Sequence, residues 1–272
     1  MQQPPTEQMH NPQLSGNVLF YSRPEPLNRE QHSHLALKQL ERPFKFAATA
    51  HVVPLTMTEF APASLSYPII FAGETRQPLA VMGVQAGENL FITPEGEVQA
   101  DAYLPAYIRR YPFVLADDQP SQRLIVCIDR GAPMLAESEG DVPLFANGEA
   151  TEYTQNAINF CNEFEAERRR TMEFVELIKS LDLLETKRAT YTPRLPDGSM
   201  GEPQLVAEYF AVSEDKLRAL PSDKYLQLRD NGAIGQIYAH IVSTLGWEKL
   251  YAKALIRRAA EQQAVPAAAN LN

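Results

Sequence analysis

Residues 67–93 read YPIIFAGETRQPLAVMGVQAGENLFIT and contain three short apolar runs, at 67–72, 79–84 and 89–93. Each run has the length of a β-strand, and the segments between the runs contain glycine, which suits tight turns. Residues 94–96 supply a further turn with a glycine at its end. Closely spaced strands pair as antiparallel neighbours, because a short connection cannot reach a parallel position. We therefore predict an antiparallel meander in this part of the chain.

Apolar segments on either side of this stretch indicate more strands. Residues 50–55 form one such segment, and residues 124–129 are apolar throughout, which is typical of a central strand. Residues 17–21 indicate a first strand near the beginning of the chain. Between these runs, residues 56–65 begin with threonines followed by a glutamate, a pattern that favours a short capped helix.

The second half of the chain has a helical character. Residues 152–184 contain neither proline nor glycine, and their apolar positions recur at helical spacing, so we predict one long helix or a bent pair. A hairpin is predicted near 189–210, followed by short helices over 213–231 and a last helical segment over 233–260, broken at Gly246. The sequence thus predicts an α+β fold: an antiparallel or mixed sheet in the N-terminal half, with a helix-rich C-terminal half packed on it.

The same patterns suggest how the 272 residues are divided. We expect disordered tails at 1–15 and 261–272, because both are short, polar or alanine-rich, and lack apolar periodicity. The sheet-containing region covers 16–145 and the helix-rich region covers 146–260, and we expect the two to form one compact unit. The chain is long enough for a sizeable buried core.

Composition excludes some partners. The chain has 25 basic and 34 acidic residues, a formal charge of −9, whereas nucleic acids and anionic membranes attract positive surfaces. No apolar run approaches the roughly 18 residues that cross a bilayer, and the N-terminus has no signal-like apolar segment. We expect a soluble, cytoplasmic protein that binds no nucleic acid and has no membrane span.

The cysteines give no indication of a metal or redox site. Cys127 lies in an apolar strand-like run and Cys161 lies on a helical face, without metal-ligand spacing between them. We interpret both as inert core residues, as expected in a reducing compartment. The sequence predicts no metal and no cofactor.

The most unusual stretch is YLPAYIRRYPF, at residues 103–113. If residues 103–111 form a helix, its tyrosines share one face at four-residue spacing, with Arg110 beside them and Arg109 on another side. One interpretation is a packed aromatic face covered by arginine stems. The other is a recognition surface, because tyrosine and arginine are enriched in binding hot spots and arginine can clamp a carboxylate or phosphate. The candidate binding residues here are Tyr103, Tyr107, Arg109, Arg110 and Tyr111.

Polar residues near the N-terminus are the other candidates. His32 and His34 are two residues apart, and a metal pair of this kind would need a further ligand such as His51. An ordinary polar cluster is the interpretation we prefer, with Asn28, Arg29, His32 and His51 as ligand- or partner-binding candidates. Asp117, Asp118 and Asp129 lie near strand ends, where surface acids are commoner than catalytic ones. The phosphate-binding, dinucleotide-binding and nucleophile-elbow motifs are absent from the sequence.

The chain resembles the SapC family over roughly residues 17–250. The resemblance rests on Pro26-Leu-Asn-Arg-Glu-Gln-His32, His51-Val-Val-Pro-Leu55 with Glu59 and Phe60, Tyr67-Pro-Ile-Ile-Phe71, Gly87-Glu-Asn-Leu-Phe91 and the stretch at 103–113. It implies no established catalytic residues. The family is named after a gene near surface-layer secretion genes, and relatives occur beside outer-membrane uptake receptors and flavin-dependent halogenases, which implies an accessory role. Some relatives carry a peptide-transporter-permease label, which does not suit a chain without a membrane span.

Two functional classes therefore stay open. The first is a non-enzymatic accessory protein that recognises a protein or peptide partner in a surface-layer or outer-membrane uptake pathway. The second is an enzyme that modifies a peptide or an amino-acid side chain, with a histidine or carboxylate site and the arginines as an anion clamp. A third hypothesis is a homo-oligomer that uses the helix at 152–184 as its interface.

Overall fold

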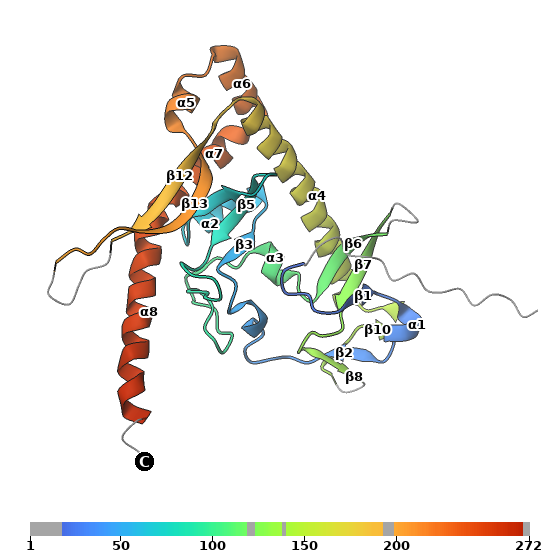
Figure 1. Cartoon of the computed structure of the whole chain (residues 1–272). Helices are drawn as coiled ribbons and strands as arrows, with labels where there is room; N and C mark the ends of the chain where they lie inside the picture. Colours follow the sequence, from blue (N-terminus) through green and yellow to red (C-terminus); the bar gives the residue numbers. More distant parts are fainter. Residues whose placement is uncertain (1–17, 119–122, 138–139, 193–198, 269–272) are drawn as a thin grey trace, which may run out of the picture. The chain divides into compact units, whose positions relative to one another are not determined.

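The computed structural model describes residues 18–118, 123–137, 140–192 and 199–268 (Figure 1). The chain divides into two compact units, each built from segments that are far apart in the sequence. Unit 1 comprises residues up to 43 together with 110–165, and unit 2 comprises 44–109 together with residues from 166 onward. The predicted α+β class is confirmed, because antiparallel sheets dominate the N-terminal half and helices the C-terminal part. The predicted domain ranges stay predictions, and the predicted tail at 1–15 lies outside the described residues.

Unit 1 contains a three-stranded antiparallel sheet in the order β1-β7-β6. Its strands are β1 (Pro24–Pro26), β7 (Arg123–Asp129) and β6 (Phe113–Asp118). The central place of β7 agrees with its continuous apolar sequence. The strand predicted at 17–21 is wrong, because its described residues form a turn in which Phe20 has a φ of 81°. Tyr21 is buried instead, and its hydroxyl donates to the carbonyl of Phe113 at 2.6 Å.

Smaller elements complete unit 1. They are α1 (Arg29–His32), the sheet β8 (Leu135–Glu137), β2 (Leu35–Leu37) and β9 (Val142–Pro143), the hairpin β10 (Phe145–Ala146) and β11 (Glu149–Ala150), and the first half of α4 (Glu152–Ser180). The beginning of α4 is fixed by Thr154, whose hydroxyl donates to the Leu144 carbonyl at 2.7 Å. Helix α4 is one continuous helix, as its lack of proline and glycine predicts.

Unit 2 is built on a five-stranded antiparallel sheet in the order β12-β13-β4-β5-β3. Its strands are β12 (Leu184–Tyr191), β13 (Gln204–Val212), β4 (Ile69–Ala72), β5 (Gln77–Val81) and β3 (Val52–Pro54). The predicted hairpin near 189–210 is thus present, and it joins the sheet where Phe210 pairs with Phe71. Antiparallel pairing of β4 and β5 confirms the first two strands of the predicted meander.

The third run of that meander, residues 89–93, is not a strand. The side chain of buried Asn89 explains the difference, because its Oδ1 accepts from the backbone N–H of Phe91 and of Ile92, at 2.9 and 3.0 Å. A side chain that binds its own backbone in this way competes with a sheet ladder. Only an isolated bridge between Ile92 and Val98 remains, closed by a turn in which Gly96 has a φ of 99°.

Helices accompany this sheet in unit 2. They are η1 (Lys45–Ala47), η2 (Met57–Glu59), α2 (Phe60–Ser64), α3 (Ala106–Arg109), the second half of α4, α5 (Glu214–Arg218), α6 (Ser222–Asp230), α7 (Ala233–Ser243), η3 (Thr244–Gly246) and α8 (Trp247–Ala268). Helix α8 covers part of the range 261–272 that was predicted to be a tail. Within the described ranges, no helix combines the length and the apolar character needed to cross a membrane.

Helix α7 packs on the sheet through buried polar contacts. The imidazole ring of His240 lies 4.8 Å from the Phe71 ring, and its Nε2 accepts from the backbone N–H of Val212 at 3.1 Å. Burial lowers the pKa of His240 to about 4, so this side chain is neutral at physiological pH. Ser243 accepts from the backbone N–H of Ile69 at 3.0 Å. His240 is therefore a core residue of unit 2.

Candidate functional site

The predicted helix over 103–111 is wrong in extent, because α3 covers only Ala106–Arg109. Pro105 begins this turn, and its carbonyl accepts from the N–H groups of Ile108 and Arg109. Tyr111 precedes a proline, which disfavours the helical conformation. The tyrosines of the stretch therefore do not share one helix face.

Glu59 holds the first part of this stretch in place within unit 2. Its Oε1 accepts from the Tyr103 hydroxyl at 3.0 Å and from the Ala106 N–H at 2.7 Å, while its Oε2 accepts from the Thr56 N–H at 2.9 Å. Burial and the neighbouring Glu59 carboxylate raise the pKa of Tyr103 to about 12. Arg109 donates to the Leu104 carbonyl at 3.1 Å. These contacts support the interpretation of a packed aromatic segment.

Tyr107 agrees with that interpretation, because it is buried. Tyr111, which belongs to unit 1, is also buried, and its hydroxyl donates to Asp129 at 3.1 Å. The guanidinium carbon of Arg110 lies 4.5 Å from the centroid of the Phe164 ring, a cation–π arrangement. A binding role for these five residues stays a prediction, but their contacts are internal.

Among the described residues of unit 1, Asp129 is a fully buried carboxylate. It accepts from the backbone N–H groups of Ser22, Arg23 and Gly131 at 3.0, 2.7 and 3.0 Å, besides the Tyr111 hydroxyl. Burial by itself raises the pKa of Asp129, but these donors outweigh burial and hold the pKa below its usual range. An ionised acid with this many donors stabilises the fold and is a poor proton carrier.

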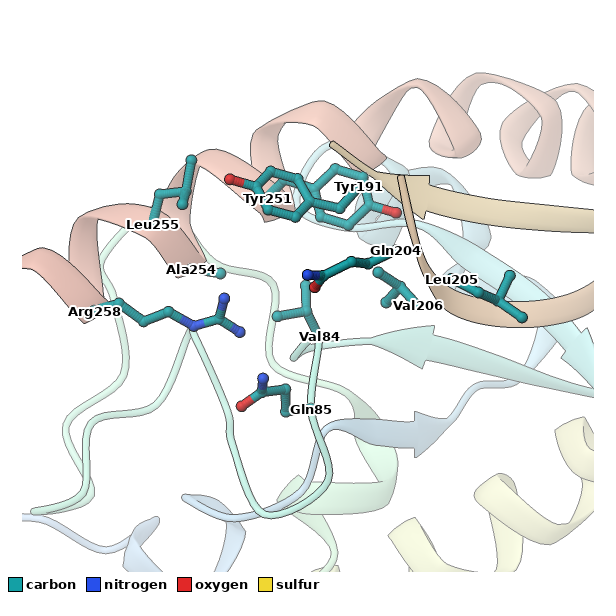
Figure 2. A pocket seen from close by; sticks show the side chains of 10 residues that line it. All are labelled: Val84, Gln85, Tyr191, Gln204, Leu205, Val206, Tyr251, Ala254, Leu255 and Arg258. Carbon is teal, nitrogen blue, oxygen red and sulfur yellow. The ribbon is translucent and has the colours of Figure 1, made fainter. Parts of the chain in front are cut away.

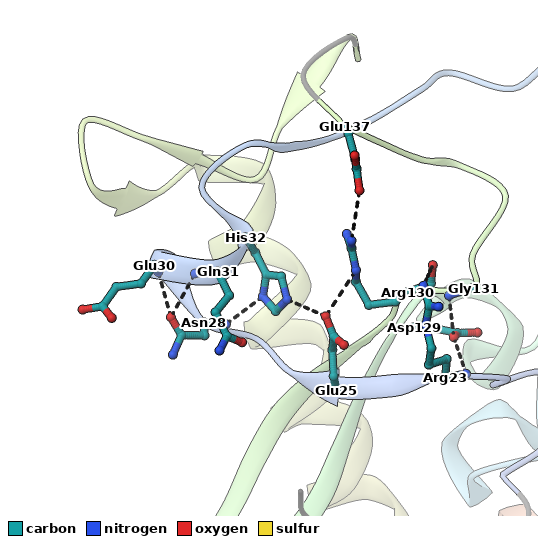
Figure 3. A network of polar contacts seen from close by, with 10 residues as sticks. All are labelled: Arg23, Glu25, Asn28, Glu30, Gln31, His32, Asp129, Arg130, Gly131 and Glu137. Carbon is teal, nitrogen blue, oxygen red and sulfur yellow. Dashed lines mark hydrogen bonds and ion pairs between the residues drawn. The ribbon is translucent and has the colours of Figure 1, made fainter. Parts of the chain in front are cut away.

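His32 in unit 1 is also held by internal hydrogen bonds, which Figure 3 shows. This buried ring accepts from the Asn28 N–H at Nδ1, at 2.9 Å, so in the neutral ring Nε2 carries the proton and donates to Glu25 at 2.8 Å. Arg130 pairs with the same Glu25 oxygen at 3.2 Å. Both ring nitrogens are therefore engaged, which suits a structural histidine better than a metal ligand or a general base.

The other polar candidates are dispersed. Asn28 caps α1 by accepting from the Glu30 N–H at 2.7 Å, whereas Arg29 and His34 are exposed. His51 belongs to unit 2, where its backbone carbonyl accepts from Met82 and Gly83 beside β3. Across the described segments, no group of three or more histidine, cysteine or acidic residues is placed to hold a metal ion. Cys127 and Cys161 are buried, and burial raises the pKa of each thiol to about 11.

A pocket in unit 2 has the features of a binding site (Figure 2). We call it the α8 pocket; it has a volume of about 160 Å³ and is lined by Val84, Gln85, Tyr191, Gln204, Leu205, Val206, Tyr251, Ala254, Leu255 and Arg258. Three segments supply these residues: the loop after β5, the loop end of the β12–β13 hairpin, and α8. Tyr191 and Gln204 are direct partners in the hairpin register.

Aromatic rings form one wall of the α8 pocket. The rings of Tyr191 and Tyr251 are 5.4 Å apart, and Tyr251 stacks on Trp247 at 5.8 Å. Trp247 continues the row to Tyr209 at 5.5 Å and donates its indole N–H to the Tyr209 hydroxyl at 3.0 Å. This row attaches α8 to the hairpin, because aromatic pairs at such distances are attractive.

Polar side chains form the other side of the α8 pocket. Figure 2 shows the head groups of Gln85, Gln204 and Arg258 pointing toward one another. Within the described part of the chain, none of these three side chains forms a hydrogen bond or an ion pair. The Tyr251 hydroxyl is buried and also lacks a hydrogen-bond partner there, and burial raises the pKa of Tyr251 to about 12. The pocket thus combines an apolar wall with hydrogen-bond donors that have no partner among the described residues, and Gln85 and Gln204 are exposed.

The sequence patterns did not single out this pocket. Tyr251 and Arg258 are seven residues apart, a spacing that puts both on one face of a helix. This spacing is the one local pattern that indicates part of the pocket. Nothing in the local sequence indicates that Gln85, Tyr191 and Gln204 lie beside them, because sheet pairing brings these segments together.

Comparison with known families identifies the chain. A family model described as SapC matches residues 27–250, which is most of the chain. The chain belongs to the SapC family. The family expected from the sequence is thereby confirmed. The SapC match includes Tyr191 and Gln204 and ends directly before Tyr251. No curated protein and no solved structure matches this SapC-family chain.

Proposed function

We propose that this SapC-family chain is a non-enzymatic accessory protein that recognises a protein or peptide partner through the α8 pocket. The observation that carries the proposal is the pairing of an aromatic wall with the unused donors of Gln85, Gln204 and Arg258. Tyrosine and arginine at a partly enclosed site are the residue types that dominate binding hot spots. The enzyme alternative gains no support from His32, whose ring nitrogens are engaged internally.

The size of the pocket favours one residue of a larger partner over a complete small molecule. Sites for drug-sized ligands have volumes of about 300–1,000 Å³, whereas the α8 pocket has about 160 Å³. Leu205 and Leu255 line the same pocket and are 59% and 45% exposed, so apolar side chains are accessible to a partner there. A pocket for one anchor within a wider apolar surface is the usual anatomy of a recognition site.

The pathway belongs to the same proposal. We place the protein in a surface-layer or outer-membrane uptake pathway, with a surface-layer protein, an uptake receptor or a halogenase-associated protein as the partner. This choice is supported only by the associations of the SapC family. A cytoplasmic location stays a prediction.

Site-specific photocrosslinking tests the proposed function. A photoreactive amino acid replaces Leu255 at the pocket, and in a second chain it replaces Leu226 on α6, which is 42% exposed and does not line the pocket. After irradiation in the native host, we expect a discrete protein or peptide adduct at position 255 that is absent at position 226. Equal labelling at the two positions, or no adduct at 255, contradicts recognition through this pocket.

A further inference from the structure

We infer that the α8 pocket binds a carboxylate that its peptide partner carries next to an apolar side chain. This inference rests on the proposed function and specifies the chemistry of the ligand. A carboxylate of this kind has two sources, the free C-terminus of a chain or the side chain of an acidic residue. Both present the same pair of oxygens, and the experiment below distinguishes them.

The charge of Arg258 is the first argument. The chain as a whole has a formal charge of −9, yet no described carboxylate pairs with this half-buried guanidinium. Two further cations of α8 lie outside the pocket lining: Lys253 donates to the Gln99 side chain at 2.5 Å and Arg257 to the Asn89 carbonyl at 2.7 Å. Among the described residues that line the pocket, Arg258 is the one charged residue. An arginine fork offers two parallel donors that match the oxygens of a carboxylate.

The neighbouring polar groups are the second argument. The amide groups of Gln85 and Gln204 point to the same space as the Arg258 guanidinium, and each amide carries two N–H donors. The buried Tyr251 hydroxyl remains protonated at neutral pH, because its pKa is raised to about 12. A buried hydroxyl without a partner is costly, and an acceptor that enters the pocket removes this cost. An anion can accept from the Arg258 guanidinium and from the amide N–H groups of both glutamines, whereas an ammonium group would meet the positive charge of Arg258.

Shape is the third argument, and it separates a peptide carboxylate from a free inorganic anion. The Tyr191 and Tyr251 rings, together with Val84 and Val206, give the pocket an apolar wall. A phosphate or sulfate ion has no apolar part to cover this wall. An aliphatic stem that ends in a carboxylate covers the wall and reaches Arg258, within a space that holds about one side chain.

Titrations with small peptide probes test this inference on the full-length protein. The probes are N-acetyl-glycyl-leucine with a free carboxylate, the same dipeptide as its C-terminal amide, and N-acetyl-glutamate with its α-carboxyl amidated. Apparent Kd values are measured by saturation-transfer NMR, with inorganic phosphate as a competitor. We expect the free acid or the glutamate probe to bind at least about tenfold more tightly than the amide, because one charged contact is lost. The tighter acid identifies the source of the carboxylate.

Variants assign the binding to the pocket. Arg258→Gln keeps most of the side-chain length and removes the charge, so the Kd of the acid probe should rise about 10- to 100-fold. Arg258→Lys should restore part of the affinity, and Tyr251→Phe should weaken it by a smaller factor. Arg229→Gln is the matched control, because Arg229 is an exposed arginine of α6 that pairs with Asp230 at 2.7 Å and does not line the pocket. This control should bind the acid probe as the unchanged protein does.

The outcomes separate the two proposals. Equal binding of acid and amide, no binding of either acid, displacement by phosphate at equal concentration, or an unchanged Kd in Arg258→Gln would overturn the carboxylate inference. A partner adduct at position 255 would leave the proposed function standing in each of these cases. Conversely, tight binding of the acid probe without any partner adduct would overturn the recognition of a peptide partner and, with it, this inference.

Discussion

Asp129 is a buried charged side chain and Arg258 is a half-buried one, and their surroundings give them opposite roles. Asp129 accepts from three backbone N–H groups and a tyrosine hydroxyl, so each of its oxygens has donors inside unit 1. Arg258 forms no hydrogen bond or ion pair with the described residues, and its guanidinium points toward the space that Gln85 and Gln204 also face. A charged group with complete internal partners stabilises the fold, whereas a charged group that lacks an internal partner is available for a ligand.

Replacement of Asp129 by asparagine should destabilise the protein at neutral pH. The substitution removes one acceptor oxygen and the charge while three backbone donors remain in place, so we expect the free energy of unfolding to fall by about 2–4 kcal/mol. Asp117→Asn is the control, because this exposed acid lies on β6 of the same sheet. Urea unfolding at pH 7 measures both variants. A loss no larger than that of the control would contradict a structural role for Asp129.

The same carboxylate predicts a pH dependence. The pKa of Asp129 is lower in the folded protein than the ordinary value of 3.8, so its contribution is complete above that value and is lost as the pH falls through the folded pKa. Unfolding free energies measured at steps below about pH 4 should therefore decline more steeply for the unchanged protein than for Asp129→Asn. If the free energies of unfolding of the two proteins declined in parallel, Asp129 would not contribute to the loss of stability at low pH.

At the scale of elements, local sequence patterns predict some features well and others poorly. The uninterrupted helical periodicity over 152–180 and the cap at 56–59 identify α4 and the η2–α2 turn, because both depend on neighbours within a few residues. The run at 89–93 resembles a strand, but the Asn89 side chain takes its backbone donors. The α8 pocket needs three segments that only the sheet brings together, so its composition could not be predicted from spacing alone.

Glu59 links η2, which the local sequence predicts, to the segment before and at the beginning of α3, which it does not predict. It closes the capping box of η2 with Thr56, and the same carboxylate also holds Tyr103 and Ala106, the first residue of α3. Glu59→Ala leaves those donors buried without an acceptor, so we expect a loss of about 3 kcal/mol in the free energy of unfolding. Glu59→Gln keeps one acceptor and should lose less.

The control for this substitution is Glu74→Ala, in the exposed turn between β4 and β5. Thermal unfolding and hydrogen exchange of the Ala106 amide measure the effect, since that N–H donates to Glu59. Faster exchange of this amide in Glu59→Ala, with little change in the control, is the expected result. Unchanged protection would mean that the 103–106 segment is held by other contacts.

At the scale of the whole molecule, the segments of the two units alternate along the chain. Unit 1 needs residues 110–165 beside its first segment, and unit 2 needs residues from 166 onward beside 44–109. In unit 2, β4 pairs with β13 at Phe71 and Phe210, and the Ile69 N–H donates to Ser243. A cut in the middle of the chain therefore removes partners from both units.

This arrangement predicts that the sheet-containing region at 16–145 does not fold as an isolated fragment. In the fragment, β4 lacks β13, and the Leu144 carbonyl lacks the hydroxyl of Thr154. We expect no cooperative thermal transition and no near-ultraviolet circular dichroism from fixed aromatic rings, because incomplete cores lose unique packing first. The matched control is the chain shortened to residues 18–268, which retains every described segment and should unfold cooperatively. A cooperative transition in the 16–145 fragment would show that the N-terminal strands form a core without the C-terminal half.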